Sequence, residues 1–395
     1  MKILVVGAGA VASVLTKLLA RRPAVEEVRC GARDLRRARL FIAGHKKIRL
    51  VRVEANNPRS IVAAGRGARL IINASLPDFN LAVMRAALKI GSHYQDLDAA
   101  LQDDVHPEQL RLDRQFRRAG LMGLINAGVS PGITNLLARQ TAEKLDRVDH
   151  IGIRVMEEQI ASELIFTWSP VVALRELTSP PLVYRHGRYT STKPFADAQQ
   201  CNFPAPFGRR LAVSIYGDEV ATIPRYISSR DVDYKASGTD VDFSKALYRL
   251  GLFNRRPVTV HGRSVVPVEL FAKLAPRVPD PKTMIRLIRS GIVEQGTFLS
   301  VVETEGRVGR RHIRINAVAR YPDLKKISRL FPGATYISYP TGVAAAAFAL
   351  LHGRPGLMRQ GVYPPEALDS SARKAVLLDL EQYGVTVSQE YSRGK

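Results

Sequence analysis

Residues 126–135 read "NAGVSPGITN" and place a serine between two glycines, so that Gly128, Ser130 and Gly132 have the spacing of a hydrolase nucleophile elbow. An apolar run, "GLMGLINA", precedes the segment, and a helical pattern, "ITNLLARQTAEKL", follows it, as that motif requires. An elbow serine also needs the backbone N–H of the next residue as an oxyanion donor, but the next residue is Pro131, which has none. The sequence therefore argues against a serine hydrolase.

A different interpretation makes Ser130 the N-cap of the following helix and Pro131 its first residue, because both residue types are favoured at these positions. The turn leaves a predicted strand at its carboxyl end, which is where ligands bind in open α/β sheets. We therefore expect Ser130, Pro131 and Gly132 to line a substrate or cofactor crevice without supplying a nucleophile.

The first residues contain a second candidate site, because "KILVVGAGAVASVLTKLL" is a short apolar strand, a glycine-rich turn and a helical pattern. Gly7 permits the tight turn, Gly9 lets a pyrophosphate approach the backbone, and Ala12 is small enough for helix–strand packing. A G-x-G-x-x-A motif in this position predicts a dinucleotide site that also includes Ala10 and Val11. The alternative is a tight βα turn that binds no ligand.

The end of the next predicted strand, "EEVRCGARD", bears on the choice of nucleotide. A free ribose 2′-hydroxyl usually meets Asp or Glu there, whereas a 2′-phosphate meets Arg. This chain has Arg33 at that point, and Asp34 follows in a place typical of a helix N-cap. We therefore predict NADP as the cofactor, with NAD possible, and include both residues in the predicted cofactor site.

The elements that must position these residues follow a βαβ rhythm up to Gly128. The apolar segments "ARLIINAS", "HYQDL" and "GLMGLINAG" are typical of buried parallel strands, and "PDFNLAVMRAALKIG" predicts a helix between them. Later, "FLSVVETEGRVGRRHIRINAVARY" predicts an antiparallel hairpin. We expect an α/β protein: an N-terminal Rossmann domain with a doubly wound parallel sheet (1–128), a mixed α/β domain (129–342), and a C-terminal helical segment that returns to the Rossmann domain (343–395).

Composition and charge restrict the partners. The 395 residues carry a formal net charge of +23, which makes a polyanion a candidate partner. The basic residues are spread along folding-competent segments, without a basic tail, zinc-finger spacing or an RNP-type motif. We therefore expect an anionic cofactor or substrate and do not expect nucleic acid as a partner.

The remaining composition predicts a cytoplasmic protein. The N-terminus enters a strand at once, which leaves no room for a signal peptide, and no apolar run reaches the roughly 18 residues that a membrane span needs. The two cysteines, Cys30 and Cys201, lie far apart and are expected to be reduced. No metal is expected, because the histidines show no metal-ligand spacing.

Five segments together resemble the saccharopine dehydrogenase-like family, which includes saccharopine reductase, carboxynorspermidine dehydrogenase and lysine 6-dehydrogenase. The resemblance spans nearly the whole chain and rests on "VVGAGAVAS", "IINASLPDFNLAVMRAALKIGSHYQDL", "GVSPGITNLLA", "ATIPRYI" and "ISYPTGVAAAAFALLHGR…GVYPPEAL". It implies hydride transfer at a C–N bond of an amino acid, by opine-type reductive condensation or its reverse, with L-lysine 6-dehydrogenase (oxidative deamination) as the alternative. It also implies a homodimer and a substrate and dimerisation role for residues 129–342.

The resemblance further implies roles for single residues near the cofactor. The loop "NASLP" would run beside the nicotinamide and its ribose, lined by Asn73, Ala74, Ser75 and Pro77. Many relatives have Asp-Pro-Gly where this chain has the serine of "SPG". That departure keeps open a cofactor-binding protein without turnover.

Three more residues take candidate roles from the resemblance. The segment "HYQD" is similar to the family's "HYVD", which places Tyr94 and Asp96 near the reacting centre, where a phenol and a carboxylate can exchange a proton with an amine. The alternative is that both are packing and capping residues. Arg225 in "IPRY" resembles an arginine that clamps the substrate carboxylate, a task suited to the guanidinium fork, and the alternative is a surface arginine.

Overall fold

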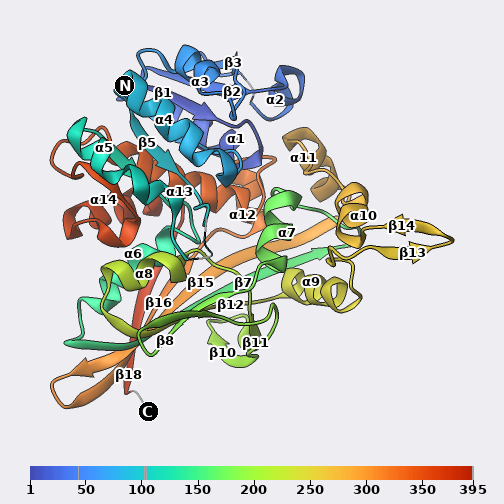
Figure 1. Ribbon diagram of the computed structural model, residues 1–395, viewed down its shortest axis with the longest axis vertical. Helices are drawn as coiled ribbons and strands as arrows, with labels where there is room; N and C mark the ends of the chain where they lie inside the picture. The colour runs from blue at the N-terminus through green and yellow to red at the C-terminus, as the bar shows by residue number, and fades with distance from the viewer. Residues whose placement is uncertain (43, 102, 104, 394–395) are drawn as a thin grey trace.

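The computed structural model describes residues 1–42, 44–101, 103 and 105–393. Two large sheets dominate it: Figure 1 shows the first sheet and its helices in the upper part and the long strands of the second sheet in the lower part. This arrangement confirms the predicted α/β fold with a Rossmann-type parallel sheet and a second, mixed sheet.

The first sheet has seven strands, and all neighbouring strands run parallel. Strand β1 shows why this region folds as predicted, since four of its five residues are buried, as in a strand covered on both faces. In sheet order the strands are β17 (Gly361–Tyr363), β6 (Met122–Leu124), β5 (His93–Asp96), β4 (Leu70–Asn73), β1 (Lys2–Val6), β2 (Glu27–Ala32) and β3 (Ile48–Arg52).

Helices cover both faces of this sheet. Ile3 and Val5 of β1 pack with helices α1 and α13, whereas Leu4 and Val6 pack with α3 and α4 on the opposite face, because successive strand residues alternate. The helices around the sheet are α1 (Ala10–Ala20), α2 (Leu35–Phe41), α3 (Pro58–Gly65), α4 (Asn80–Ile90), α5 (Asp113–Arg118), α13 (Ser338–Leu351) and α14 (Ser370–Glu381).

The second sheet has nine strands and is antiparallel except where β12 pairs with β7. The predicted hairpin is present as β15 and β16. Its strands are β7 (Arg147–Ala161), β8 (Leu182–Arg185), β9 (Arg188–Ser191), β10 (Gln199–Phe203), β11 (Gly208–Ser214), β12 (Ser229–Ser237), β15 (Val293–Val308), β16 (Arg311–Arg320) and β18 (Thr386–Arg393).

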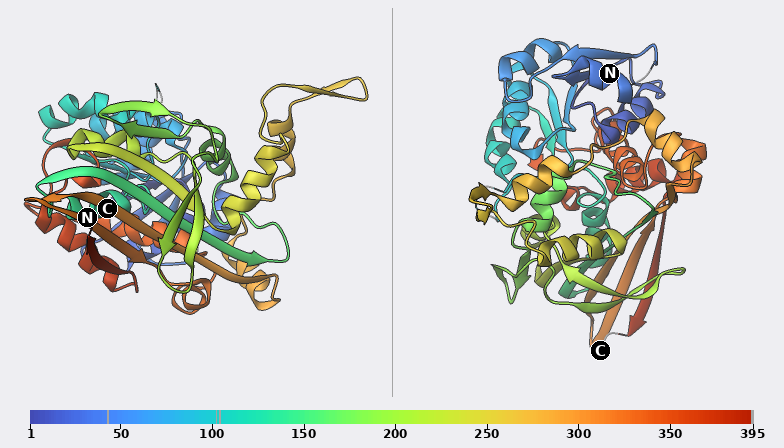
Figure 2. Two further views of the ribbon diagram at one scale, coloured as in Figure 1. Left: turned by 90° about the horizontal axis from the view of Figure 1, so that it is seen from below. Right: turned by 90° about the vertical axis from the view of Figure 1, so that its right-hand side faces the viewer.

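The remaining helices lie around the second sheet. Helix α6 packs on β15 and β16 from the side that faces the first sheet. A small hairpin, β13 (Val258–Val260) and β14 (Arg263–Val265), projects from the body, as Figure 2 shows. The helices are α6 (Ile133–Ala142), α7 (Pro170–Thr178), α8 (Glu219–Tyr226), α9 (Thr239–Arg249), α10 (Pro267–Leu274), α11 (Pro281–Arg289) and α12 (Leu324–Leu330).

The C-terminal part of the chain contributes to both sheets. Strand β17 extends the first sheet beside β6, as expected for a segment that returns to the Rossmann domain. Strand β18 instead pairs with β16 in the second sheet, so the last strand of the chain does not follow that expectation. Within the described residues, every helix is too short or too polar to cross a membrane.

Candidate active site

The glycine-rich turn after β1 forms an open cradle. Gly7 has φ +113°, and a Cβ there would lie 2.5 Å from the backbone oxygen of Ala74, so only glycine fits. A Cβ at Gly9 would meet nothing within 4 Å. Among the described residues, no side chain caps the N-terminus of α1, so its first N–H groups face this space. These features fit the pyrophosphate of a dinucleotide, which binds at a bare helix N-terminus.

The end of β2 lies beside this cradle, because the Gly7 N–H donates to the oxygen of Gly31 at 2.8 Å. Arg33 follows β2 directly and is exposed. Asp34 is the N-cap of α2, and its Oδ1 accepts from the backbone N–H groups of Arg36 at 2.9 Å and Arg37 at 3.1 Å. These bonds hold the pKa of Asp34 below its usual value, so its carboxylate is committed to the helix.

The predicted N-cap at Ser130 is wrong by two residues. Helix α6 begins at Ile133, and Gly132 is its N-cap, with its N–H donating to Oδ1 of Asn135 at 2.8 Å. Gly132 has φ +134°, and a Cβ there would lie 2.0 Å from the oxygen of Gly128. The serine motif therefore has glycine at positions 128 and 132 because the backbone passes close to itself there. This turn places Pro131 before the helix.

The Ser130 hydroxyl is held by a buried carboxyl group. It donates to Oε1 of Glu219 at 2.6 Å, and the Thr134 hydroxyl donates to the same oxygen at 2.7 Å. The hydroxyl oxygen of Tyr234 lies 3.3 Å from the hydroxyl oxygen of Ser130. Burial raises the pKa of Glu219 to about 7. The serine thus fixes the loop to α8, and its partners differ from those of an elbow nucleophile.

A cavity of about 200 Å³, called here the inner cavity, opens where the carboxyl ends of β1, β4 and β5 face the second sheet. Predicted residues Val11, Ala74, Ser75, Pro77, Ser130 and Pro131 line it. Its other lining residues are Leu97, Asp98, Gly128, Val129, Glu157, Trp168, Ser169, Val172, Glu176, Tyr234, Phe298, Ile337, Pro340 and Thr341.

Three acidic residues in this lining were missed from the sequence: Asp98, Glu157 and Glu176. They come from three elements, the loop after β5, strand β7 and helix α7, and only the "DLD" spacing after "HYQ" could have drawn attention to Asp98. Burial, with the nearby Asp218 carboxyl, holds the pKa of Asp98 well above its usual value. Burial also raises the pKa of Glu176 well above its usual value and that of Glu157 to about 8.

Tyr94 and Asp96 lie behind the cavity and are not among its lining residues. Tyr94 is fully buried, and its hydroxyl donates to Oδ2 of Asp96 at 2.8 Å. Asp96 also accepts from Gln109 Nε2 at 3.0 Å and from the Asn126 N–H at 2.8 Å. Burial outweighs these donors and raises the pKa of Asp96 to about 7. The pair joins β5 to the start of the loop that contains Ser130.

Asn73 shapes the loop after β4 from within. It is 2% exposed, its Oδ1 accepts from the N–H of Ser75 at 3.1 Å, and its Nδ2 donates to Oδ1 of Asn80 at 2.6 Å. The same Asn80 oxygen lies 3.1 Å from the Tyr94 hydroxyl, and Asn80 Nδ2 donates to the backbone carbonyl oxygen of Asp98 at 2.9 Å. Asn80, which sequence reasoning missed, thus connects the predicted cofactor loop to the acidic wall.

Arg225 does not reach the inner cavity. It is exposed on α8, its Nε donates to the oxygen of Ala221 at 3.0 Å, and its guanidinium lies 5.7 Å from the centre of the Tyr189 ring. The last turn of the helix directs this side chain along the helix and onto Tyr189. The predicted carboxylate clamp is therefore not assembled from Arg225 at this cavity.

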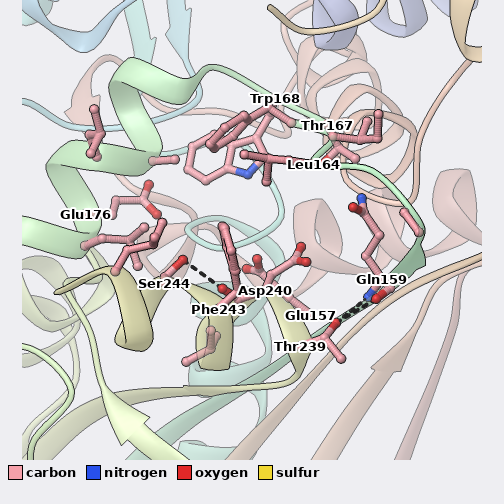
Figure 3. Close-up of a pocket in the computed structure, with 18 of the residues that line it drawn as sticks. Glu157, Gln159, Leu164, Thr167, Trp168, Glu176, Thr239, Asp240, Phe243 and Ser244 are labelled. Carbon is pink, nitrogen blue, oxygen red and sulfur yellow. Dashed lines mark hydrogen bonds between the residues drawn. The ribbon is translucent and has the colours of Figure 1, made fainter. Parts of the chain in front are cut away.

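A second cavity, called here the outer cavity, adjoins the inner one. It has a volume of about 330 Å³ and shares Glu157, Trp168 and Glu176 with the inner cavity. Figure 3 shows the carboxylates of Glu157 and Asp240 side by side below the Trp168 ring. No group of three or more His, Cys, Asp or Glu in the described part of the chain is arranged to hold a metal ion.

A parallel sheet of this order, with a glycine cradle at the carboxyl end of its interior strand β1 and a cavity at the strand ends, defines a dinucleotide-binding protein of the Rossmann class. The family model "Saccharopine dehydrogenase NADP binding domain" matches residues 3–124, and the model "Saccharopine dehydrogenase C-terminal domain" matches residues 128–385. The chain therefore belongs to the saccharopine dehydrogenase family, as its sequence segments predict.

Named relatives and solved structures agree with this membership. The chain is 24% identical to carboxyaminopropylagmatine dehydrogenase of Synechocystis over 93% of each chain, and 24% identical to carboxynorspermidine synthase of Vibrio alginolyticus over 82% of this chain and 79% of that one. Its fold matches apo saccharopine dehydrogenase (L-Glu forming) of Saccharomyces cerevisiae with TM-score 0.73, 13% identity and 99% coverage of each chain.

A second solved structure shares the fold over the whole chain. Homospermidine synthase of Legionella pneumophila, solved in complex with NAD, matches with TM-score 0.70 and 13% identity over 100% of this chain and 93% of that one. The cofactor class follows from the family model for residues 3–124, whose description names NADP binding.

Proposed function

We propose that this protein is an NADP(H)-dependent dehydrogenase that acts at a carbon–nitrogen bond of an amine substrate. The observation that carries the proposal is the inner cavity, where Val11 and Ser75 of the predicted cofactor site face the carboxyl groups of Asp98, Glu157 and Glu176. A bound nicotinamide would supply or accept a hydride there. The amine names of the two relatives support an amine as the substrate.

The preference for NADP rests on Arg33. It occupies the end of β2 beside the glycine cradle, and the neighbouring carboxylate of Asp34 is already used as a helix cap. A guanidinium suits a 2′-phosphate, while no carboxylate is left at this point to pair with a ribose hydroxyl.

Within the proposal, Asp98 is the residue that exchanges a proton with the substrate. In reductive condensation a neutral amine attacks a carbonyl carbon and its nitrogen loses a proton. The hydroxyl group that forms takes up a proton and leaves as water, and a hydride then reduces the resulting iminium. Asp98 lines the cavity, and burial with the nearby Asp218 carboxyl raises its pKa well above its usual value, which favours the protonated form that can donate to a substrate. Asp96 and Tyr94 then act as positioning residues, because they lie behind this wall.

The charges of the cavity favour an amine over an amino acid held by its carboxylate. Among the described residues that line the inner cavity, none is Lys, Arg or His, and its charged residues are all acidic. We therefore favour an amine or polyamine as the substrate over saccharopine or lysine, because a carboxylate-lined cavity complements a positively charged molecule. Homodimer formation remains an expectation, which light scattering of the purified protein tests.

The test is oxidation of NADPH by the purified protein with amines paired with aldehydes or keto acids, and the reverse reaction with lysine and saccharopine. We expect turnover with an amine pair, and Asp98→Asn should lower turnover about a hundredfold or more while NADPH still binds. Glu108→Gln serves as the matched control, since this partly buried residue is absent from both cavity linings. Tight NADPH binding without turnover of any pair would instead support a cofactor-binding protein.

A further inference from the structure

Resting on the proposed function, we propose that Ser130 and Glu219 form a proton relay for the reaction. The Ser130 hydroxyl accepts the proton that the substrate nitrogen loses and passes its own proton to Oε1 of Glu219. The reaction needs such an acceptor, because Asp98, which burial keeps in its protonated form, can donate a proton but cannot accept one.

The relay begins at the inner cavity and ends at a carboxyl group outside it. Ser130 lines the cavity, whereas Glu219 is not among the lining residues and is 0% exposed. The Ser130 hydroxyl donates to Oε1 of Glu219 at 2.6 Å, a distance typical of a charge-assisted hydrogen bond between a hydroxyl and a carboxylate. A proton that moves from the cavity to Glu219 therefore has one hydrogen bond to cross, and that bond already points toward the carboxylate.

The surroundings of Glu219 allow both of its protonation states. The two hydroxyl groups that donate to Oε1 favour the carboxylate, whereas Oε2 has no donor among the described residues. Burial, with the nearby Asp218 carboxyl, outweighs these donors and raises the pKa of Glu219 to about 7. The other titratable groups that act on it, Glu176 and Tyr234, add no positive charge. A base with a pKa near neutral pH can both accept and return a proton.

The backbone holds the Ser130 hydroxyl in place. The N–H of Gly128 donates to the oxygen of Pro131 at 3.1 Å, so the loop closes on itself around the serine. At the start of the loop the N–H of Asn126 donates to Oδ1 of Asp96 at 2.8 Å, which is how Asp96 acts as a positioning residue. A group that transfers protons must stay within about 0.5 Å of its working position, and these bonds restrain the loop on both sides of Ser130.

The relay balances the protons of reductive condensation. After the amine attacks, an N–H bond of the positively charged nitrogen breaks and an O–H bond forms on Ser130, while the serine proton forms an O–H bond on Glu219. The carbonyl oxygen needs two protons to leave as water: Asp98 donates the first, and Glu219 returns the second through Ser130. Ser130 and Glu219 end as they began, the iminium remains for reduction, and Asp98 regains its proton from solvent after the product leaves.

The test measures kcat against pH with NADPH, a saturating diamine and a carbonyl partner that gives turnover. In the wild-type protein kcat should rise as the pH increases through about 7, because Glu219 must be ionised to accept the proton. Glu219→Gln keeps an acceptor oxygen for both hydroxyl groups but cannot take up a proton. It should therefore lower kcat about a hundredfold or more and abolish the rise near pH 7, while NADPH binding stays unchanged.

Further variants separate proton transfer from structural support. Glu219→Asp retains a carboxyl group and should recover part of the turnover together with its pH dependence. Ser130→Ala should lower kcat about as much as Glu219→Gln, and Ser130→Thr, which keeps a hydroxyl, should restore most of it. Glu366→Gln is the matched control, because Glu366 is also 0% exposed with a pKa raised to about 7 by burial, yet lies outside both cavity linings. Its kcat and pH profile should match the wild type.

The outcomes distinguish the relay from the dehydrogenase itself. Wild-type turnover together with an unchanged kcat and pH profile in Glu219→Gln contradicts the relay and retains the dehydrogenase. Equal losses in Glu219→Gln and Glu366→Gln assign the effect to the packing of buried carboxyl groups and also overturn the relay. Absence of turnover with every pair of amine and carbonyl compound contradicts the dehydrogenase and the relay with it.

Discussion

At the scale of single residues, the proposal gives Tyr94 and Asp96 a positioning role in place of a catalytic one. Both are buried behind the inner cavity, and the Tyr94 hydroxyl donates to Asp96 at 2.8 Å. Tyr94→Phe should lower the free energy of unfolding by about 1–2 kcal/mol, since a buried carboxyl group loses a donor, while turnover of the folded protein changes little. Thermal denaturation and turnover on the same preparation check this. A hundredfold loss of turnover at unchanged stability would return Tyr94 to a catalytic role.

Arg33 decides which dinucleotide binds better. Arg33→Ala should weaken NADPH binding by roughly ten- to a hundredfold, because a charge-assisted contact is worth about 1.5–3 kcal/mol, and should leave NADH binding unchanged. Fluorescence titration of both cofactors measures this. Arg39→Ala, an exposed position on the following helix α2, is the matched control. A preference for NADPH that survives Arg33→Ala means that another residue recognises the 2′-phosphate.

The acidic pair of the outer cavity predicts how cation binding depends on pH. Burial and Asp240 raise the pKa of Glu157 to about 8, and burial raises the pKa of Asp240 to about 6. The groups around them are acidic or phenolic, namely Glu158, Glu176, Tyr234 and Tyr336. Below these pKa values the carboxyls are protonated and neutral, and above them they are charged, while an aliphatic amine stays cationic throughout.

Affinity for a diamine should therefore rise as the pH increases from about 6 to about 8.5, and binding at neutral pH should release protons. Calorimetry in two buffers of different ionisation enthalpy counts the released protons. Proton uptake, or an affinity that falls over this interval, would contradict the pKa directions inferred for this pair.

At the scale of elements, we expect opposite effects from replacing a glycine in each of two turns, the one before α6 and the one before α1. Gly132→Ala should destabilise the protein by about 3 kcal/mol or more, because its Cβ would lie 2.0 Å from the oxygen of Gly128 and strain and overlap each cost about 1–3 kcal/mol. Gly9→Ala should keep the stability, since its Cβ meets nothing within 4 Å, yet weaken NADPH binding. Denaturant unfolding and cofactor titration separate the outcomes. Normal NADPH affinity in Gly9→Ala would show that the cradle binds something else.

The sequence could predict those elements whose formation depends on residues that are close together in the chain. The apolar run of β1, the cap at Asp34 and the hairpin of β15 and β16 depend on neighbouring residues, so their signals are visible in the chain itself. The N-cap at Ser130 fails because Gly132 meets the backbone of Gly128, a contact that residue preferences do not encode.

The acidic cavities show what the sequence could not reveal. Glu157, Glu176 and Asp240 come from β7, α7 and α9, and no spacing rule connects residues that meet only through tertiary packing. Arg225 illustrates the reverse case, because its motif suggests a role in substrate binding but its helix directs the side chain onto Tyr189.

At the scale of the whole molecule, the net charge of +23 should affect how fast each ligand arrives. Anionic NADPH approaches along an attractive field, so its association rate should fall several-fold as salt rises from about 0.05 M to about 0.5 M, where the Debye length becomes short. A diamine approaches against the same field and should show no parallel fall. Stopped-flow fluorescence measures both rates. An NADPH rate that is insensitive to salt would mean that the positive charge lies far from the cofactor cradle.

The late return of the chain to the first sheet has a consequence for biosynthesis. Helix α13 covers α1 so closely that a Cβ at Gly342 would lie 2.5 Å from Cβ of Val14, and β17 forms the seventh strand beside β6. While the ribosome is still making the second sheet, the nascent N-terminal part therefore has an uncovered apolar helix face and an unpaired strand edge. The cofactor-binding part can be completed only after residue 363 has left the exit tunnel, so the first sheet is completed after all strands of the second sheet except β18 have been made.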